Sequence, residues 1–101
     1  MIIYNVTTGV DKSVEQEWLK WMKEYHIPHV MATRLFLSYK IYKVLSTENE
    51  ESVSYAVQYS VKSLNEFEKY LDEFAPSLRD AVTKKFGERA PSFRTLLEEI
   101  N

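Results

Sequence analysis

The chain has 101 residues, enough for one domain over residues 1–101, and 45% of them are hydrophobic. Its formal net charge is −2, so it lacks the basic footprint of proteins that bind nucleic acid or anionic membranes. The lack of cysteine excludes disulfides and thiol chemistry, and no apolar run approaches the roughly 20 residues of a membrane helix. The N-terminal segment has no basic region of a signal peptide, and we expect a cytoplasmic protein.

The first expected elements are a strand and an amphipathic helix. Residues 1–8 are rich in β-branched and aromatic side chains and predict a strand that Gly9 ends. Ser13 and Gln16 fit a capping box at the start of a helix. The apolar residues that follow recur at helical spacing, which predicts one apolar stripe. They are Val14, Trp18, Trp21, Met22 and Tyr25.

Both histidines of the chain lie in residues 25–36, YHIPHVMATRLF, on either side of a proline. Because a proline disfavours helical backbone at the residue before it, Ile27 should be extended and the helix should stop near His26. Pro28 suits the first position of a new, short helical turn that runs to about Ala32. This segment is therefore predicted to be a helix stop followed by a restart.

Two segments of alternating polarity predict a β-hairpin, with the acidic residues 47–51 as its loop. One face of the first segment carries Leu35, Leu37, Tyr39 and Ile41, and the other carries Phe36, Ser38, Lys40, Tyr42 and Val44. The second segment has one face that we expect to pack against helices, with Val53, Tyr55, Val57, Tyr59 and Val61.

A second helix and a last strand complete the chain. Ser63 and Glu66 form a capping box before a run of apolar residues at spacings of three and four. Pro76 should kink or restart this helix, and Gly87 is a plausible end for it. Residues 92–100 predict the last strand.

The element order β-α-β-β-α-β is the signature of an α+β, ferredoxin-like fold: a four-stranded antiparallel sheet with two helices on one face. Two helices leave the other face bare, and that face mixes aromatic with polar side chains. An exposed apolar patch of this kind usually marks a contact or a ligand site. We therefore expect a homodimer formed through the bare face. The interface residues predicted there are Phe36, Tyr42 and Val44.

The segments MIIYNVT, WLKWM, HIPHVMATRLF and YAVQY together resemble a domain-of-unknown-function family of short uncharacterised bacterial proteins. Its members resemble the dimeric α+β barrel superfamily, which includes cofactor-independent monooxygenases, muconolactone-isomerase-like enzymes and stress-responsive barrel proteins. The resemblance covers nearly the whole chain and implies a dimeric α+β barrel, but it supplies no catalytic residues. One departure is Arg34, where a glycine is expected after MAT. This departure puts a tight glycine turn in doubt and adds a cation near the cavity mouth.

The histidines His26 and His29 allow three interpretations. Zinc needs three or four ligands, and two histidines without cysteine do not supply them, so we expect no metal site. We also expect no cofactor. His26 at a helix C-terminus would interact favourably with the helix dipole, which is a purely structural role. Alternatively, His26 is a general base at the barrel mouth, because the unperturbed pKa of histidine is about 6.5.

Polar residues on the expected strands are the other candidates for a binding site. Asn5 could orient a ligand carbonyl or phenolate, although a buried amide with a cross-strand partner is the plainer interpretation. Trp18 and Trp21 fall on the apolar stripe of the first helix and are expected in the core. The ligand-binding residues predicted from the sequence are Asn5, His26, His29 and Gln58.

Three functions are compatible with this pattern. The first is a binding or accessory module for a small, partly apolar ligand. The second is a cofactor-independent enzyme of the monooxygenase or isomerase type, with His26 as base and Asn5 or Gln58 orienting the substrate. The third is a structural or protein-interaction dimer without a ligand, which would have no cavity of roughly 300 Å³ or more.

Overall fold

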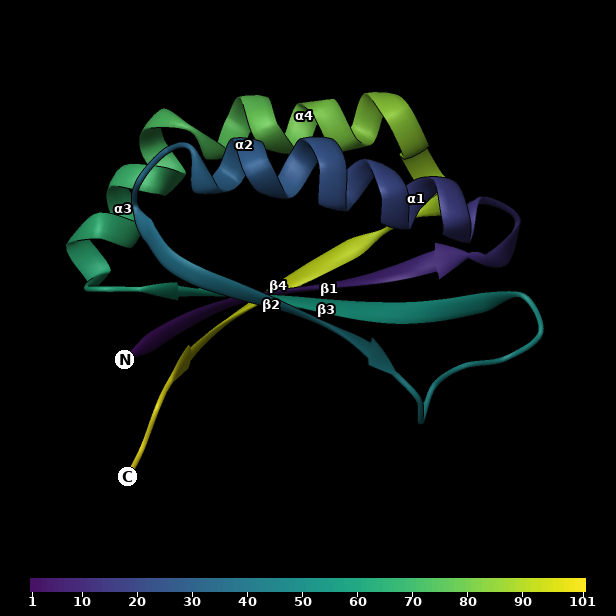
Figure 1. The fold of residues 1–101 in the computed structure, drawn as a ribbon, viewed down its shortest axis with the longest axis horizontal. Helices are drawn as coiled ribbons and strands as arrows, with labels where there is room; N and C mark the ends of the chain where they lie inside the picture. The colour runs from purple at the N-terminus through teal and green to yellow at the C-terminus, as the bar shows by residue number, and fades with distance from the viewer.

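The structure is a computed structural model that describes residues 1–101. Its helices lie on one face of a four-stranded sheet (Figure 1). The strands are β1 (Ile2–Asp11), β2 (Phe36–Val44), β3 (Ser52–Val61) and β4 (Ser92–Glu98). The helical segments are η1 (Lys12–Val14), α1 (Glu15–Trp21), the π-helical η2 (Met22–His26), α2 (Ile27–Met31), α3 (Leu64–Glu73), α4 (Ala75–Phe86) and η3 (Gly87–Arg89). None of the helices has the length and hydropathy needed to span a membrane.

All neighbouring strands in the sheet are antiparallel, in the order β2-β3-β1-β4. The first and third strands are central and the second is at an edge, as the crossover rule predicts. This arrangement is the ferredoxin-like fold expected from the sequence. Tyr4 pairs with Tyr59 on one side and with Leu96 on the other, which fixes the register of the two central strands and β4.

The covered face of the sheet carries the core. The five residues of β3 predicted to face the helices are all buried, which confirms the alternation read from the sequence. They are Val53, Tyr55, Val57, Tyr59 and Val61. From the helices, Trp18 and Phe86 are almost fully buried against this face. An aromatic, close-packed core therefore joins the central strands to two helical segments on the same face of the sheet. The segment α1–η2–α2 is called the first helical layer below, and the segment α3–α4 is called the second.

The first helical layer contradicts the predicted stop at the proline. The backbone of Ile27 is helical, with φ −61° and ψ −44°, and the chain continues from α1 through η2 into α2 without an extended residue. The N–H of Ile27 donates to the carbonyl of Met22, five residues back. This wider turn lies directly before Pro28, whose ring would otherwise collide with the carbonyl four residues earlier. His26 consequently does not end a helix.

The entry to this layer also differs from the prediction. β1 runs past Gly9 and ends at Asp11, and the cap of the first turn is Asp11 rather than Ser13. An oxygen of the Asp11 carboxylate accepts hydrogen bonds from the side-chain hydroxyl of Ser13 at 2.7 Å and from its backbone N–H at 2.8 Å. These two bonds lower the pKa of Asp11.

The second helical layer follows the sequence pattern. The Ser63 hydroxyl accepts the N–H of Glu66 at 3.3 Å, so the predicted cap is confirmed. The layer is interrupted at Phe74, whose φ is −123°, and it restarts with Pro76 in the first turn of α4. Gly87 ends α4 with a φ of 57°, a value that glycine adopts at little cost.

Strand β2 begins with an irregularity that reverses the predicted side of its first residue. Phe36 pairs with Val61 and Ser38 pairs with Ser60, so one extra residue is inserted between them. As a result, Phe36 lies on the covered face, where it is only 5% exposed and packs on the ring of Tyr70. The prediction that Phe36 lies on the face without helices was therefore wrong. Tyr42 does lie on the opposite side, as predicted.

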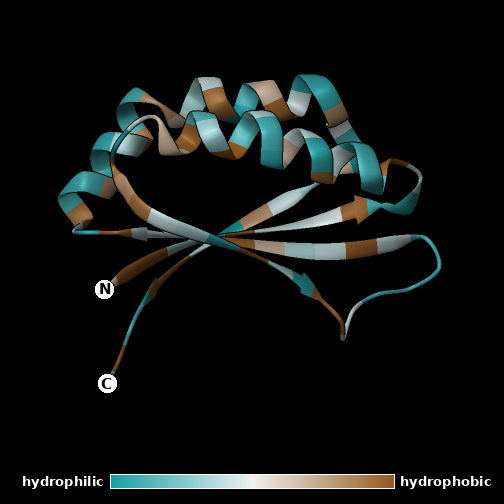
Figure 2. Cartoon of the chain, viewed as in Figure 1, coloured by the Kyte–Doolittle hydropathy of each residue, from teal (hydrophilic) through white to brown (hydrophobic).

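The opposite side of the sheet, called the open face below, has no helix over it (Figure 1). By register, its side chains are Ile3, Asn5 and Thr7 of β1, Ser38, Lys40, Tyr42 and Val44 of β2, Ser54, Ala56, Gln58 and Ser60 of β3, and Phe93, Thr95 and Leu97 of β4. Tyr42 is 45% exposed and Phe93 is 64% exposed. Hydrophobic residues also occur on the strands and near both chain ends, away from the helices (Figure 2).

The tight turn after α2 is present although no glycine supplies it. Arg34 has a φ of 65°, the only positive φ at a residue other than glycine. Its N–H donates to the carbonyl of Met31 at 3.1 Å, which closes the turn. The side chain of Arg34 is exposed and does not line the cavity described below, so the expected cation at the cavity mouth is not this residue.

Candidate functional site

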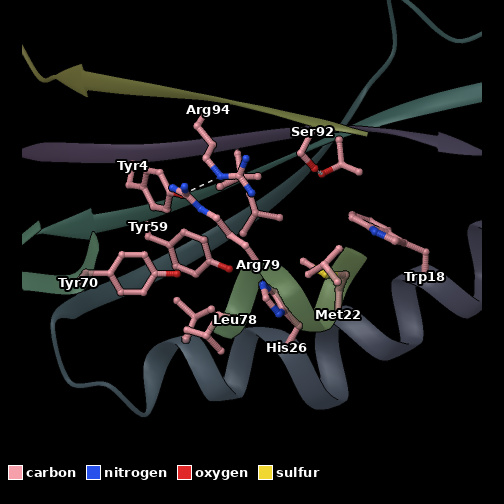
Figure 3. Close-up of a pocket in the computed structure, with 15 residues that line it drawn as sticks. Tyr4, Trp18, Met22, His26, Tyr59, Tyr70, Leu78, Arg79, Ser92 and Arg94 are labelled. Carbon is pink, nitrogen blue, oxygen red and sulfur yellow. Dashed lines mark hydrogen bonds between the residues drawn. The ribbon is translucent and has the colours of Figure 1, made fainter. Parts of the chain in front are cut away.

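A small cavity of about 40 Å³ lies between the helices and the covered face of the sheet. Ten of its 15 lining side chains are hydrophobic, so it is an apolar space with few polar groups. The first helical layer contributes Trp18, Met22, His26 and Val30. Across the cavity lie residues of the strands, α3 and α4, among them Tyr4, Tyr59, Tyr70, Leu78 and Arg79 (Figure 3).

The four lining residues of the first layer are spaced four apart in the sequence, from Trp18 to Val30. In an α-helix with 3.6 residues per turn, each step of four overshoots a full turn by about 40°, so four such residues drift off one face. The wider turn through η2 takes more residues per revolution and reduces this drift. The turn that accommodates Pro28 therefore also directs His26 into the cavity.

The polar groups that line the cavity are rich in hydrogen-bond donors. Trp18 Nε1 and Arg79 Nε are buried and have no hydrogen-bond partner, which is unusual in a folded protein. The hydroxyl groups of Tyr59 and Tyr70 point into the same space (Figure 3). Burial raises the pKa of both phenols, so each keeps its proton at neutral pH.

Two arginines converge on one hydroxyl at the rim of the cavity. Arg79 Nη2 donates to the Tyr4 hydroxyl at 3.1 Å, and Arg94 Nε donates to the same oxygen at 3.1 Å. Arg79 comes from α4 and is half-buried, whereas Arg94 comes from β4 and is exposed. The lining contains no aspartate or glutamate. The rim therefore carries positive charge without a carboxylate beside it.

His26 is neutral in this environment. Burial lowers its pKa to about 4, and the positive charges of His29 and Arg94 act in the same direction. Its ring stacks on that of Trp21, with centroids 5.3 Å apart and planes 19° from parallel. A histidine with this pKa is a weak base at neutral pH, because general bases work best when their pKa lies near the working pH.

His29 lies outside the cavity, although only two residues separate it from His26. Its ring is exposed on α2, tilts against the ring of Tyr25 and has Nδ1 2.6 Å from the Tyr25 carbonyl. No three histidine, aspartate or glutamate side chains gather in the structure as metal ligands would. The two histidines therefore do not form one site.

Asn5 and Gln58 are cross-strand neighbours on the open face, on the other side of the sheet from His26. Asn5 Nδ2 donates to the Thr7 hydroxyl at 2.9 Å, which gives this nearly buried amide a partner in its own strand. Gln58 lines a shallow hollow of about 300 Å³ on the open face, together with Tyr42. The four predicted ligand-binding residues are thus divided between two faces and do not converge.

Sequence reasoning missed the polar group at the rim of the cavity: Arg79 and Arg94, which carry its charge, and Tyr4, whose hydroxyl accepts from both. One signal was available for Arg94. By alternation along β4, Arg94 lies on the covered face together with Ser92 and Leu96. A charged residue therefore occupies a position at which the strand should face the core. Nothing local to the sequence places Arg79 beside Tyr4, because the two are 75 residues apart.

Comparison with known proteins identifies a family but not an activity. The family described as "Domain of unknown function (DUF4286)" matches residues 1–100. No curated protein matches the chain.

Several solved structures share the fold. HapK from Hahella chejuensis has a TM-score of 0.70 at 10% identity, covering 99% of this chain and 93% of that one. A candidate antibiotic biosynthesis monooxygenase from Deinococcus radiodurans has a TM-score of 0.68 at 15% identity, covering 100% and 94%. A dimeric ferredoxin-like protein from an uncultured marine organism has a TM-score of 0.54 at 18% identity, covering 98% of both chains. At these identities the similarity establishes the fold alone.

Proposed function

The chain belongs to the family of the domain of unknown function DUF4286, and from its own cavity we propose that it is a binding or accessory module for a small, partly apolar ligand. The ligand would lie between the helices and the covered face of the sheet. Sites for small molecules are typically concave and mostly apolar, with a few polar groups that fix orientation.

The observation that carries this proposal is the pair of buried donors without partners. A filled core has no reason to leave Trp18 Nε1 and Arg79 Nε without acceptors, because each orphaned donor costs about 1–3 kcal/mol. A ligand with an acceptor would recover that cost. The cavity is much smaller than an ordinary ligand pocket of roughly 300–1,000 Å³. Ligand entry therefore requires the rim side chains, Arg79 among them, to move.

We further propose that the protein acts as a homodimer through the open face. Support comes from the exposed aromatic rings of Tyr42 and Phe93 on a sheet face that no helix covers. A second copy would bury them and would enclose the hollow that Gln58 lines. A solved protein of the same fold is described as dimeric. The cytoplasmic location stays a prediction that rests on the lack of cysteine.

The ligand proposal is tested by NMR titration of the ¹⁵N-labelled protein with a panel of small aromatic alcohols, amides and carboxylates. We expect at least one compound to shift resonances of His26, Val82 and Ser92, which line the cavity from three elements. Shifts confined to the open face around Gln58 would move the site to the other side of the sheet. If no compound changes the spectra, a dimer that binds no ligand is the better explanation.

A catalytic role for His26 is the second candidate, because His26 does line the cavity. Its low pKa argues for hydrogen bonding rather than for proton abstraction at neutral pH. The enzyme proposal requires a His26→Gln variant that stays folded, still binds the cavity ligand and loses turnover of it. The binding module would be supported instead if the native protein shows no turnover of the ligand and the His26→Gln variant binds the ligand less tightly.

A further inference from the structure

We propose that the ligand's polar end is a carboxylate, bound between Arg79 and Arg94 beside the Tyr4 hydroxyl. This inference rests on the proposed function, because it names the chemical class of the molecule that the cavity binds. The ligand would be a small organic acid with an apolar body.

The first support is that neither of the two guanidinium groups has a carboxylate partner. Several lysines of the chain form ion pairs: Lys12 and Lys43 with Glu48, Lys84 with Asp80, and Lys85 with Glu17. Arg79 and Arg94 have no carboxylate within ion-pair distance, although both point at one neutral phenol. Like charges that converge without a counter-ion repel each other, so an anion placed between them would be favoured.

The second support is the shortage of acceptors around the two arginines. Arg79 uses Nη2 for the Tyr4 hydroxyl, while its buried Nε has no partner. The Tyr4 oxygen accepts two hydrogen bonds, and its own O–H donates to no protein atom. A carboxylate has two oxygens that accept several bonds in one plane, which matches the planar donor array of arginine. It could therefore accept from Arg79, Arg94 and Tyr4 together.

The third support is the position of the arginines between two spaces of different polarity. On one side lies the mostly apolar cavity, with Met22 and Leu78 in its wall. On the other lies a hollow of about 190 Å³, which has Arg79 and Arg94 in its lining as well. A molecule with an apolar body and a charged end fits such a junction. A free dianion such as phosphate would lose more hydration there and would leave the apolar walls without a partner.

The test compares three probes of known chemistry on the full chain at pH 7.5: benzoate, its neutral analogue benzamide, and inorganic phosphate. Binding is measured by NMR titration of the cavity resonances for the native protein and three variants. Arg79→Met and Arg94→Met remove one guanidinium each and keep an unbranched apolar side chain. Lys84→Met removes the same charge from an exposed position of α4 and is the matched control.

We expect benzoate to bind at least about tenfold more tightly than benzamide, and each arginine variant to lose about tenfold in benzoate affinity. The Lys84→Met control should stay within about twofold, since exposed charges are screened. Benzamide binding in the cavity as tightly as benzoate, with no effect of the arginine variants, overturns the carboxylate and leaves the proposed function standing. Phosphate alone binding in an arginine-dependent way also overturns it, in favour of a free oxyanion. No cavity shift with any of the three probes overturns the carboxylate, and the proposed function is then decided by the wider panel of compounds described above.

Discussion

The ring of Phe36 lies 6.0 Å from the ring of Tyr4, centroid to centroid, and the two planes are 14° from parallel. This stack places the first residue of edge strand β2 on the same side of the sheet as the covered face of central strand β1. Phe36 therefore belongs to the hydrophobic core of one copy of the chain.

Replacing Phe36 with alanine should lower the free energy of unfolding by about 3–5 kcal/mol, as is typical for a buried phenylalanine. The measurement is a urea titration followed by circular dichroism. Tyr42→Ala is the control on the same strand, and its loss should be clearly smaller because Tyr42 is half exposed. Equal losses in the two variants would place Phe36 outside the core.

Dimerisation is predicted to depend on the open face. Tyr42→Asp and Phe93→Asp each introduce a charge where a second copy should pack, so sedimentation equilibrium should detect dissociation to monomers. Leu45→Asp is the control, because Leu45 is 76% exposed and follows the end of β2. If the native protein sediments as a monomer, or if both face variants remain dimeric, the open face is not the interface.

Stability should fall as the pH is lowered through the range where His26 is protonated in the unfolded chain. The folded pKa of His26 is about 4 and the unfolded value is about 6.5, so the unfolded state binds more protons between these limits. Stability therefore rises with pH in this range. From pH 7.5 to pH 5, we expect a loss of about 2 kcal/mol from His26.

The histidine contribution is isolated by comparing urea midpoints of the native protein and of His26→Gln at both pH values. The variant should lose less stability on acidification than the native protein. His29→Gln, which removes the exposed histidine instead, should keep most of the loss, because burial is the largest cause of the low pKa of His26. An identical pH dependence in the native protein and in His26→Gln would mean that His26 is not buried as described.

The turn at Arg34 should be strained, because a residue with a Cβ atom pays roughly 1–2 kcal/mol in left-handed backbone. Arg34→Gly should stabilise the protein by about 0.5–1 kcal/mol after the larger entropy loss of glycine is included. Thermal unfolding measures this difference. Arg34→Ala keeps the Cβ atom and should give no such gain, whereas a gain from alanine would point to the arginine side chain instead.

Much of the fold could be predicted because strong local signals agreed with it. The alternation of Val53 to Val61 identified a central strand and its covered face, and Ser63 and Gly87 marked helix ends through their own chemistry. The errors arose where tertiary packing overrode a local rule. Pro28 was accommodated by a wider helical turn, and one inserted residue in β2 turned Phe36 toward the core.

The candidate site was harder to predict than the fold, for a physical reason. Tyr4, Arg79 and Arg94 lie on three different elements, and only the register of the sheet and the packing of α4 bring them together. A histidine pair separated by a proline attracts attention in a sequence, yet His29 points away from the cavity that His26 lines. Proximity in sequence was a poor guide to proximity in the site.

The most direct test of the central claim is a crystal structure of the protein grown in the presence of benzoate. We predict that benzoate lies between the helices and the sheet, with its ring against Met22 and Leu78 and its carboxylate within hydrogen-bond distance of Arg79 or Arg94. Benzoate found only on the open face, near Gln58, would contradict that claim. So would a closed, empty cavity in which Trp18 Nε1 and Arg79 Nε have found protein acceptors.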